Sequence, residues 1–409
     1  MNKLNGLILG VGNFANFPLQ RFTKIQEKRY GQDLSERIGN LWLADIDESA
    51  LNEKGEEFGI PSKNRIKIDN SKGIDKTILD KLNFAVVATP AAIHYDTTVP
   101  FIVQGIPTFL PKPIDIDYRR AKDLIALAEQ HGTPNASGSQ MMLHPAFVKA
   151  KEYIKEKEIK VKDVVINWVK ERGPREHVIP GITIEEGPHP FGILSVLKQK
   201  MPYRVNAIAR DGEIIITPNE WAKPVDKTGT EYKGETEYKD KKYILAEISK
   251  VSMANLKYRD GSLATVINHF ENPRKARTVE IIGELPEGER YQRSVVVYVD
   301  LTDMKKKYVE PYKEHMPHIR KGTIVWQGCL DKSKKDRTGL GRIVLNESYE
   351  EADDIGAQFN AFLDWAETGK KPEYLATFAD QFRSEKLIDA VNKSIAKDAE
   401  VRYNGVDYV

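Results

Sequence analysis

A glycine-rich turn close to the N-terminus constrains the fold of this chain more than any other feature. The apolar run Leu4–Leu9 predicts a buried strand, and the sequence GVGNFA follows it directly. Residues 17–30 then carry apolar side chains at helical spacing. A strand, a turn of the pattern G-x-G-x-x-G/A and a helix are typical of a dinucleotide-binding unit, in which a pyrophosphate lies at the positive end of the helix. The residues predicted to bind it are Gly10, Gly12, Asn13, Phe14 and Ala15.

Strands and helices alternate through the first third of the chain. Leu41–Asp45, Phe84–Thr89 and Thr108–Leu110 are short apolar runs that predict strands, whereas residues 97–104 and 118–131 predict helices. This alternation is typical of a parallel α/β sheet with helices on its faces. We therefore predict a doubly wound Rossmann domain over residues 1–135.

The pattern changes after Gly132. Longer strands that alternate between two faces are predicted at residues 161–169, 279–283 and 294–300, and a hairpin at 256–267. We predict a C-terminal α+β domain over residues 136–409 with a largely antiparallel open sheet. The polar stretch from about 304 to 351 is predicted to be an insertion that lies outside both cores.

The charge balance and the cysteine count exclude several kinds of partner. Lys and Arg total 62 and Asp and Glu total 60, so the formal charge of +2 gives no basis for binding nucleic acid or an anionic membrane. No apolar run approaches the roughly 20 residues of a membrane helix. Cys329 is the only cysteine, which excludes an intrachain disulfide and a cysteine metal cluster. We expect a cytoplasmic protein with a small-molecule substrate and no metal.

An acidic residue ends the second predicted strand. In a Rossmann domain a carboxylate at this position, here Asp45, takes the ribose hydroxyls of the dinucleotide. It would also repel the additional phosphate of NADP, so NAD is the expected cofactor and NADP is less favoured. The alternative is that Asp45 only caps the end of its strand.

Two prolines hold a lysine in the sequence LPKPID. Pro111 and Pro113 fix their own φ angles, and each restricts the residue before it, so the backbone of Lys112 is stiff. The simplest explanation is a strand that ends in a proline-rich turn. The other is that a functional lysine needs a fixed base.

At this point the sequence resembles the Gfo/Idh/MocA oxidoreductases, which include glucose-fructose oxidoreductase and inositol 2-dehydrogenase. The resemblance covers nearly the whole chain. It rests on an ordered set of stretches, GVGNFA, LADIDESA, VVATPAAIH, LPKPID, MMLHPAF, EEGPHPFG and FNAFLDWAETGKKP. The family implies an N-terminal Rossmann domain and a C-terminal domain whose open sheet forms homodimer or homotetramer contacts.

The resemblance also implies roles for residues of the first domain. Lys112 corresponds to the lysine that reaches both the nicotinamide ribose and the substrate hydroxyl, and its bond to Pro113 is expected to be cis. Pro111 stands where the family has glutamate. Thr89, Pro90 and His94 would lie beside the cofactor, although His94 could equally be a histidine at a helix start.

The second candidate cluster lies in EEGPHPFG. The family pattern matches at His189, with Glu185 in place of its first acid and Gly192 in place of its last. Pro190 suits the first position of a helix, which His189 would cap as a neutral imidazole able to accept a proton. Glu185 would orient His189; the alternative is a plain capping histidine. The predicted substrate pocket consists of Lys112, Met142, His144 and His189, although Met142 could be core and His144 a helix-start residue.

Together these features predict an NAD-dependent dehydrogenase of sugars, cyclitols or related polyols. Its catalytic residues would be Lys112, His189 and Glu185. Two alternatives are a non-catalytic, nucleotide-dependent sensor on the same fold, which the departures at Pro111 and Gly192 favour, and an NAD-dependent enzyme that eliminates glycosides.

Overall fold

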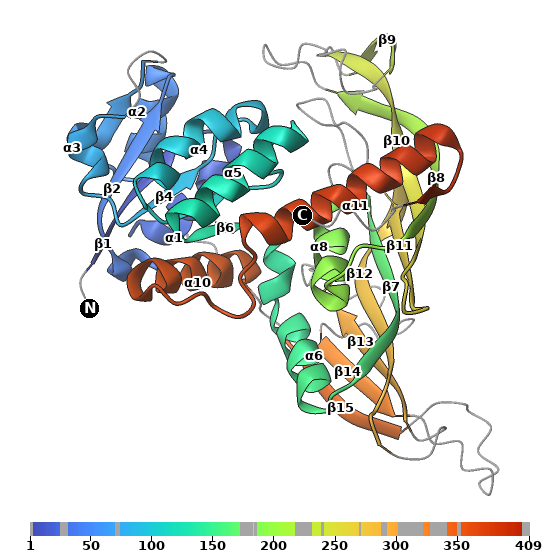
Figure 1. Ribbon diagram of the computed structural model, residues 1–409. Helices are drawn as coiled ribbons and strands as arrows, with labels where there is room; N and C mark the ends of the chain where they lie inside the picture. The colour runs from blue at the N-terminus through green and yellow to red at the C-terminus, as the bar shows by residue number, and fades with distance from the viewer. Residues whose placement is uncertain are drawn as a thin grey trace, which may run out of the picture. The chain divides into compact units, whose positions relative to one another are not determined.

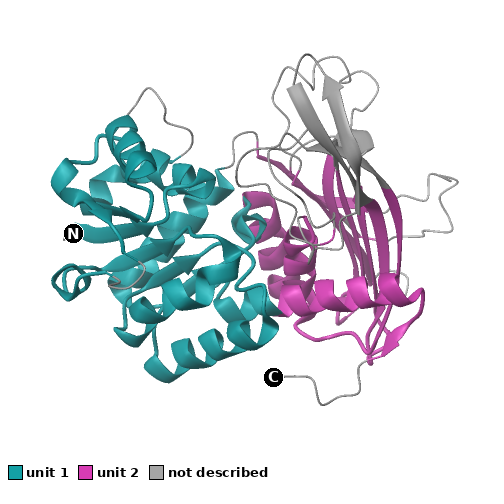
Figure 2. Ribbon diagram, turned by 90° about the horizontal axis from the view of Figure 1, so that it is seen from above, with its two compact units in different colours: residues 1–144, 352–382 teal, residues 145–351, 383–409 magenta. Residues whose placement is uncertain are grey.

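A computed structural model describes most of the chain as two compact units (Figure 2). The first unit comprises residues 1–144 and 352–382, and the second comprises residues 145–351 and 383–409. The first unit thus extends past the predicted boundary at residue 135. It also includes residues 352–382, which lie near the C-terminus. The described residues are 3–24, 32–69, 74–171, 183, 186–216, 231–238, 241–269, 271–287, 293–301, 322–327, 342–349 and 353–402.

The first unit is built on a six-stranded parallel sheet in the order β3-β2-β1-β4-β5-β6 (Figure 1). This is the Rossmann order, as predicted. Its strands are β1 (Leu4–Leu9), β2 (Ile38–Asp45), β3 (Arg65–Lys67), β4 (Phe84–Val87), β5 (Thr108–Leu110) and β6 (Asn135–Ser137). Its helices are α1 (Asn16–Phe22), α2 (Glu48–Glu57), α3 (Lys76–Leu79), α4 (His94–Val103), α5 (Tyr118–His131) and α10 (Asp354–Thr368).

Alternate residues of β1 belong to two different cores, because a strand presents successive side chains to opposite faces of its sheet. Ile8 packs in a cluster with residues of α1 and α10. Leu7 packs in a second cluster with residues of α4 and α5. Both faces of the sheet are therefore covered, which explains why its strands are continuously apolar. The segment 352–382 belongs to this unit because α10 completes the first core.

The second unit is built on a ten-stranded mixed sheet, and among the described strands only β7 and β11 pair in parallel. Its strands are β7 (Lys160–Glu171), β8 (Arg204–Ile216), β9 (Glu231–Tyr238), β10 (Lys241–Lys257), β11 (Leu263–His269), β12 (Glu271–Glu284), β13 (Ser294–Asp300), β14 (Gly322–Gln327), β15 (Arg342–Ser348) and β16 (Val401–Arg402). Its helices are α6 (Pro145–Glu156), α8 (Pro188–Lys198) and most of α11 (Phe378–Lys397), which lie along one face of the sheet (Figure 1).

Part of the predicted polar insertion belongs to this sheet, so that prediction was wrong for residues 322–327 and 342–348. β14 pairs with both β13 and β15, and Val325 is fully buried. Helices cover one face of this sheet and leave its other face open (Figure 1), so its strands need apolar side chains only at alternate positions. The polar composition of residues 304–351 therefore did not exclude strands within that stretch. Residues 302–321 and 328–341 lie outside the described residues.

Candidate active site

The predicted cofactor residues of the first unit come together at one edge of its sheet. They lie at or just after the carboxyl ends of β1, β2, β4 and β5, and the carboxyl ends of parallel strands share one edge. The strand order reverses between β1 and β4. Ligands of open α/β sheets bind in the crevice at such a switch point. The sequence therefore identified the residues that share this edge.

The two glycines of the first loop have different surroundings. Gly10 has a φ of +91°, and a Cβ there would lie 2.7 Å from the backbone of Ala88. Only glycine fits that position. A Cβ at Gly12 would meet no protein atom within 4 Å, and Gly12 and Asn13 are exposed. Asn13 begins a 3₁₀ turn that leads into α1, and the N–H groups of Ala15 and Asn16 are bonded to carbonyl oxygens within this turn. The space beside Gly12 and Asn13 is open, as a pyrophosphate site requires.

The loop geometry gives a test that separates cofactor binding from folding. Because the space beside Gly12 is open, we expect Gly12→Ala to unfold at the temperature of the unmodified protein while binding NADH at least tenfold more weakly. Calorimetric titration and thermal unfolding measure the two effects. Gly10→Ala is the matched comparison, and we expect it to lower stability as well. Unchanged NADH affinity in Gly12→Ala would show that the pyrophosphate does not bind at this turn.

Asp45 supports the backbone of the glycine loop. Its Oδ2 accepts a hydrogen bond from the N–H of Val11 at 2.7 Å, and its Oδ1 accepts one from the N–H of Asp47 at 2.9 Å. The carboxylate is half-buried. Each carboxylate oxygen has a second acceptor position, so these bonds leave room for ribose hydroxyl groups. Asp45 therefore does cap the end of its strand, and this capping is compatible with ribose binding.

A hollow of about 490 Å³ lies beside the ends of β2 and β3 and is lined by Ile46, Lys67, Ile68 and Asp69. Ile46 directly follows Asp45 and is 58% exposed. If Asp45 binds the ribose, an exposed apolar side chain next to it is suited to contact the flat face of a nucleotide base. The hollow therefore extends the candidate cofactor site past Asp45.

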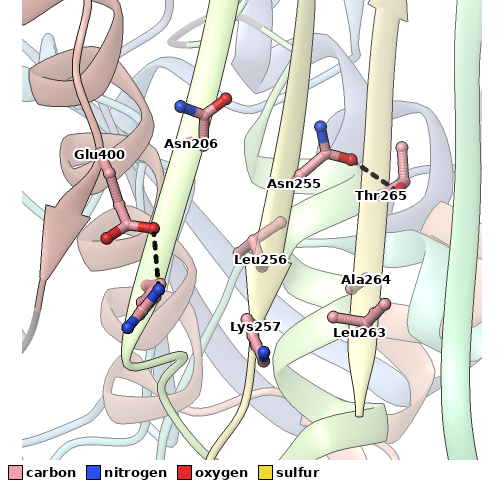
Figure 3. A pocket seen from close by; sticks show the side chains of 9 residues that line it. Asn206, Asn255, Leu256, Lys257, Leu263, Ala264, Thr265 and Glu400 are labelled. Carbon is pink, nitrogen blue, oxygen red and sulfur yellow. Dashed lines mark hydrogen bonds and ion pairs between the residues drawn. The ribbon is translucent and has the colours of Figure 1, made fainter. Parts of the chain in front are cut away.

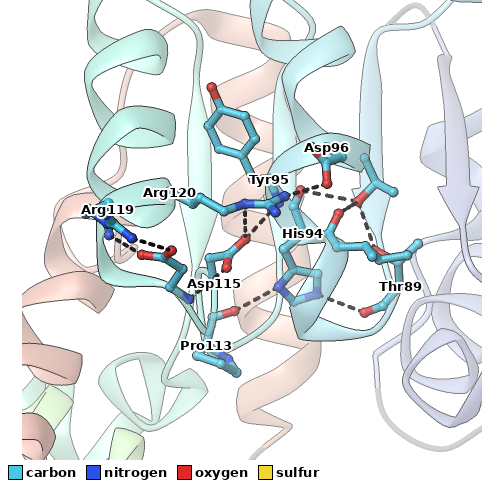
Figure 4. A network of polar contacts seen from close by, with 11 residues as sticks. Thr89, His94, Tyr95, Asp96, Pro113, Asp115, Arg119 and Arg120 are labelled. Atoms are coloured by element: carbon cyan, nitrogen blue, oxygen red, sulfur yellow. Dashed lines mark hydrogen bonds and ion pairs between the residues drawn. The ribbon is translucent and has the colours of Figure 1, made fainter.

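His94 is a buried structural residue at the first position of α4 (Figure 4). One ring nitrogen lies 2.8 Å from the carbonyl oxygen of Thr89 and the other lies 2.8 Å from that of Pro113. Burial lowers the pKa of His94, although the two carbonyl oxygens oppose this effect. The ring therefore ties the end of β4 to the segment that contains Lys112. This geometry agrees with the helix-start alternative, since both ring nitrogens are engaged.

Lys112 follows the end of β5 and is half-buried. Its bond to Pro113 is cis, as the resemblance implied. The next turn is held by Asp115, which is buried and accepts hydrogen bonds from the N–H groups of Tyr95 and Asp117. Arg120 lies 3.6 Å from Asp115 (Figure 4). The backbone that carries Lys112 is thus fixed on its C-terminal side.

Two further predicted residues of the first unit are buried. Met142 lies in the 3₁₀ turn Gln140–Leu143, and His144 follows that turn directly before α6. Thr89 and Pro90 lie between β4 and α4, and the hydroxyl of Thr89 is 3.0 Å from that of Thr97.

His189 lies in the first turn of α8 in the second unit. The helix begins at Pro188 and its N-cap is Gly187, so the prediction that His189 caps the helix was wrong. A Cβ at Gly187 would lie 2.0 Å from the carbonyl oxygen of Thr183, which explains the glycine. Most of α8 is buried, whereas His189 is half-buried and remains accessible in part. Glu185 lies outside the described residues.

The sequence analysis missed a side chain that packs on His189, namely Trp168. The rings of Trp168 and His189 are nearly parallel, at 18°, with centroids 5.4 Å apart. Trp168 Nε1 donates to the buried carboxylate of Glu186 at 2.9 Å. Trp168 is on β7, far from His189 in the sequence, so no local pattern could have revealed this contact.

The second unit also has a shallow pocket of about 300 Å³ over β8, β10 and β11 (Figure 3). Its lining includes Asn206, Asn255 and Thr265, and the hydroxyl of Thr265 donates to Asn255 at 2.9 Å. None of the predicted catalytic residues lines it. Over the described ranges, no three metal-ligating side chains gather and no helix has the length and apolarity that a membrane span requires.

The fold and the loop at the edge of the first sheet define a dinucleotide-binding Rossmann protein. Residues 4–138 match the model of the oxidoreductase family with an NAD-binding Rossmann fold, Gfo/Idh/MocA. This match confirms the resemblance for the first unit, whose residues 4–138 are similar to the NAD-binding Rossmann domain of Gfo/Idh/MocA oxidoreductases. No curated protein matches the sequence at a significant level.

Several solved structures share the fold over almost the whole chain. UDP-N-acetylglucosamine 3-dehydrogenase from Acidithiobacillus ferrooxidans is 14% identical, with a TM-score of 0.63 and coverage of 97% of this chain and 99% of its own. GenD2 from gentamicin A biosynthesis, in complex with NAD, is 20% identical, with a TM-score of 0.63 and coverage of 99% and 97%. Myo-inositol 2-dehydrogenase from Lactobacillus plantarum is 17% identical, with a TM-score of 0.62 and coverage of 98% and 100%.

Proposed function

We propose that this oxidoreductase is an NAD-dependent dehydrogenase that acts on the CH–OH group of a sugar, cyclitol or related polyol. The observation that carries the proposal is the open glycine loop beside Asp45, in a family of oxidoreductases. Structurally similar proteins named for sugar or inositol oxidation support the substrate class. Nicotinamide, when bound, supplies the acceptor for the hydride of the carbinol carbon.

In this proposal Lys112 stabilises the oxygen of the reacting hydroxyl group. Lys112 is a half-buried residue, and a partly desolvated ammonium group stabilises a developing alkoxide more strongly than an exposed one, because less water screens its charge. The prolines on both sides and the turn held by Asp115 limit the movement of its backbone. Fixing the base of the side chain leaves less freedom to lose in the transition state.

His189 takes the hydroxyl proton in this proposal. The N-terminal end of a helix disfavours a positive charge, which favours the neutral imidazole that a general base requires. Partial exposure gives the proton a path to solvent after reaction. Lys112 belongs to the first unit and His189 to the second, so a double variant must test whether they serve the same step.

The cofactor is proposed to be NAD. We expect unmodified protein to bind NADH at least tenfold more tightly than NADPH, because the carboxylate of Asp45 repels the additional phosphate. Asp45→Asn should narrow this ratio, although total affinity also falls because Asp45 supports Val11. Fluorescence titration with both reduced cofactors measures the ratio, and Asp47→Ser, which keeps the cap of α2, is the control. Tighter NADPH binding by unmodified protein would contradict the assignment.

The open face of the second sheet is proposed to form a homo-oligomer. Ile208, Met253 and Leu263 lie on β8, β10 and β11 and are 58%, 36% and 49% exposed. Exposed apolar side chains on adjacent strands are typical of an interaction surface. Analytical ultracentrifugation tests this, and a monomer at micromolar concentration would contradict it.

The activity itself is tested with a panel of sugars, cyclitols and linear polyols incubated with NAD. We expect at least one class to give NADH, followed by its near-ultraviolet absorbance. If NADH binds but no compound in the panel reduces NAD, the sensor alternative is favoured.

A further inference from the structure

The buried contact between Trp168 and His189 assigns a function to a residue that the proposed mechanism does not use. Trp168 is 1% exposed and lies on the covered face of β7, towards α8. Its ring and that of His189 are 18° from parallel with centroids 5.4 Å apart. This is the geometry of an offset stack, which is favoured over a face-to-face arrangement. The indole thus restricts the plane of the imidazole.

Two other side chains hold the indole. Glu186 accepts the hydrogen bond from Nε1 at 2.9 Å and is 3% exposed. The guanidinium of Arg277 lies 4.9 Å from the centre of the Trp168 ring. Arg277 is the register partner of Trp168 on β12, so the two share a face of the sheet. The indole is therefore fixed at its edge by a carboxylate and over its ring by a cation.

Glu186 also connects the indole to the backbone of the histidine. Its carbonyl oxygen accepts a hydrogen bond from the N–H of His189 at 3.0 Å. The turn that starts α8 and the ring that packs on His189 are thus joined through a single residue. Glu186 therefore supports His189 through its backbone, whereas Glu185, which the sequence predicted to orient His189, lies outside the described residues.

We propose that Trp168 is a positioning residue for His189, held in place by Glu186 and Arg277. The inference rests on the proposed role of His189 as the base. A base must accept a proton and release it without losing its geometry. An indole face suits both states, since it packs against neutral imidazole by dispersion and attracts imidazolium through its π system. Arg277 over the same indole offsets part of that attraction.

The contact can be tested without any substrate. Imidazolium quenches the fluorescence of an indole that it touches, because it accepts an electron from the excited ring, and neutral imidazole does so much less. We expect tryptophan emission of the unmodified protein to fall on acidification through the histidine range. That fall should be absent in both His189→Gln and Trp168→Phe. Identical pH profiles for unmodified protein and His189→Gln would overturn the proposal.

Kinetics test the positioning role. Trp168→Leu removes the stack, and we expect turnover to fall by about 10²-fold while NADH affinity is unchanged, since misplacing a catalytic group has effects of this order. Trp168→Phe, which keeps a stacking ring, should retain more activity than Trp168→Leu. Trp365→Phe, at a half-buried tryptophan in α10, is the matched control and should keep the full rate.

The outcomes separate this inference from the proposed function. If His189→Gln loses activity and Trp168→Leu does not, positioning by the indole is refuted while the base is retained. If His189→Gln keeps its full rate, the base assignment fails, whatever the fluorescence shows. Circular dichroism of each variant identifies loss of folding, and Trp168→Phe provides the kinetic comparison if Trp168→Leu does not fold.

Discussion

His189→Ala is expected to lower turnover of the identified polyol by about 10²–10⁴-fold, the usual effect of removing a general base. NADH affinity should stay the same, because His189 lies outside the Rossmann unit. Steady-state rates and calorimetric titration measure the two quantities. His131→Ala is the control, since His131 is an exposed residue at the end of α5. An undiminished rate in His189→Ala would place the base elsewhere, and Glu185, Glu186 and His144 would be tested next.

Lys112→Met belongs to the same experiment, because methionine keeps an apolar chain of similar length without the charge. Loss of the ammonium should lower turnover by about 10²–10³-fold, as for other donors to a developing oxyanion. If Lys112 and His189 act on one hydroxyl group, the double variant should lose less than the product of the two single losses. Strictly multiplicative losses would show that they act in separate steps.

Arg21→Ala is expected to cause the largest loss of stability, about 3–5 kcal/mol, because it removes a buried side chain and leaves the partly buried Asp353 without its partner. The guanidinium is 1% exposed and forms two bonds to Asp353, at 3.0 and 2.5 Å. Asp353 in turn caps α10. The ion pair between Arg21 and Asp353 therefore links α1 to the start of α10, in the segment 352–382.

Urea unfolding followed by tryptophan fluorescence, to which Trp42 and Trp365 of the first unit contribute, measures this effect. Lys24→Ala is the control, because Lys24 pairs with Glu36 on the open surface. We expect its unfolding midpoint to be unchanged, since exposed pairs contribute little. If Arg21→Ala and Lys24→Ala shift the midpoint equally, the buried pair does not fasten the segment.

The same pair makes a pH-dependent contribution. Burial raises the pKa of Asp353, but Arg21 and the N–H groups of Gln32 and Gly356 outweigh it and lower the pKa below that of an ordinary aspartate. A carboxyl group with a lowered pKa in the folded state stabilises the protein above its unfolded pKa. This contribution is lost as the pH falls through the folded pKa.

The first unit was predictable because its signals are local. The glycine turn follows its strand directly, and Asp45 ends the next strand, so each element could be recognised within about ten residues of sequence. A covered parallel sheet also makes each strand continuously apolar. The return of α10 to this unit was not predictable, because an apolar helical face does not specify which sheet it covers.

The surroundings of His189 depend on contacts between distant segments. Trp168 and Arg277 meet because β7 and β12 pair, and their sequence positions give no sign of that pairing. Local reasoning chose Glu185 as the orienting acid, and that residue lies outside the described residues; it did not single out Glu186, whose carbonyl oxygen accepts from the N–H of His189 and whose carboxylate accepts from Trp168. The same limitation led the open sheet strands β14 and β15 to be assigned to an insertion.

The most direct test of the central claim is the transfer of deuterium from substrate to cofactor. A polyol that carries deuterium on the carbinol carbon is incubated with the protein and NAD, and the nicotinamide is analysed by mass spectrometry. Our proposal predicts that each reduced cofactor carries one deuterium and that deuterated NADH and the carbonyl product form in equal amounts. Substrate conversion that leaves NAD fully oxidised would contradict simple dehydrogenation and indicate transient oxidation, as in glycoside elimination.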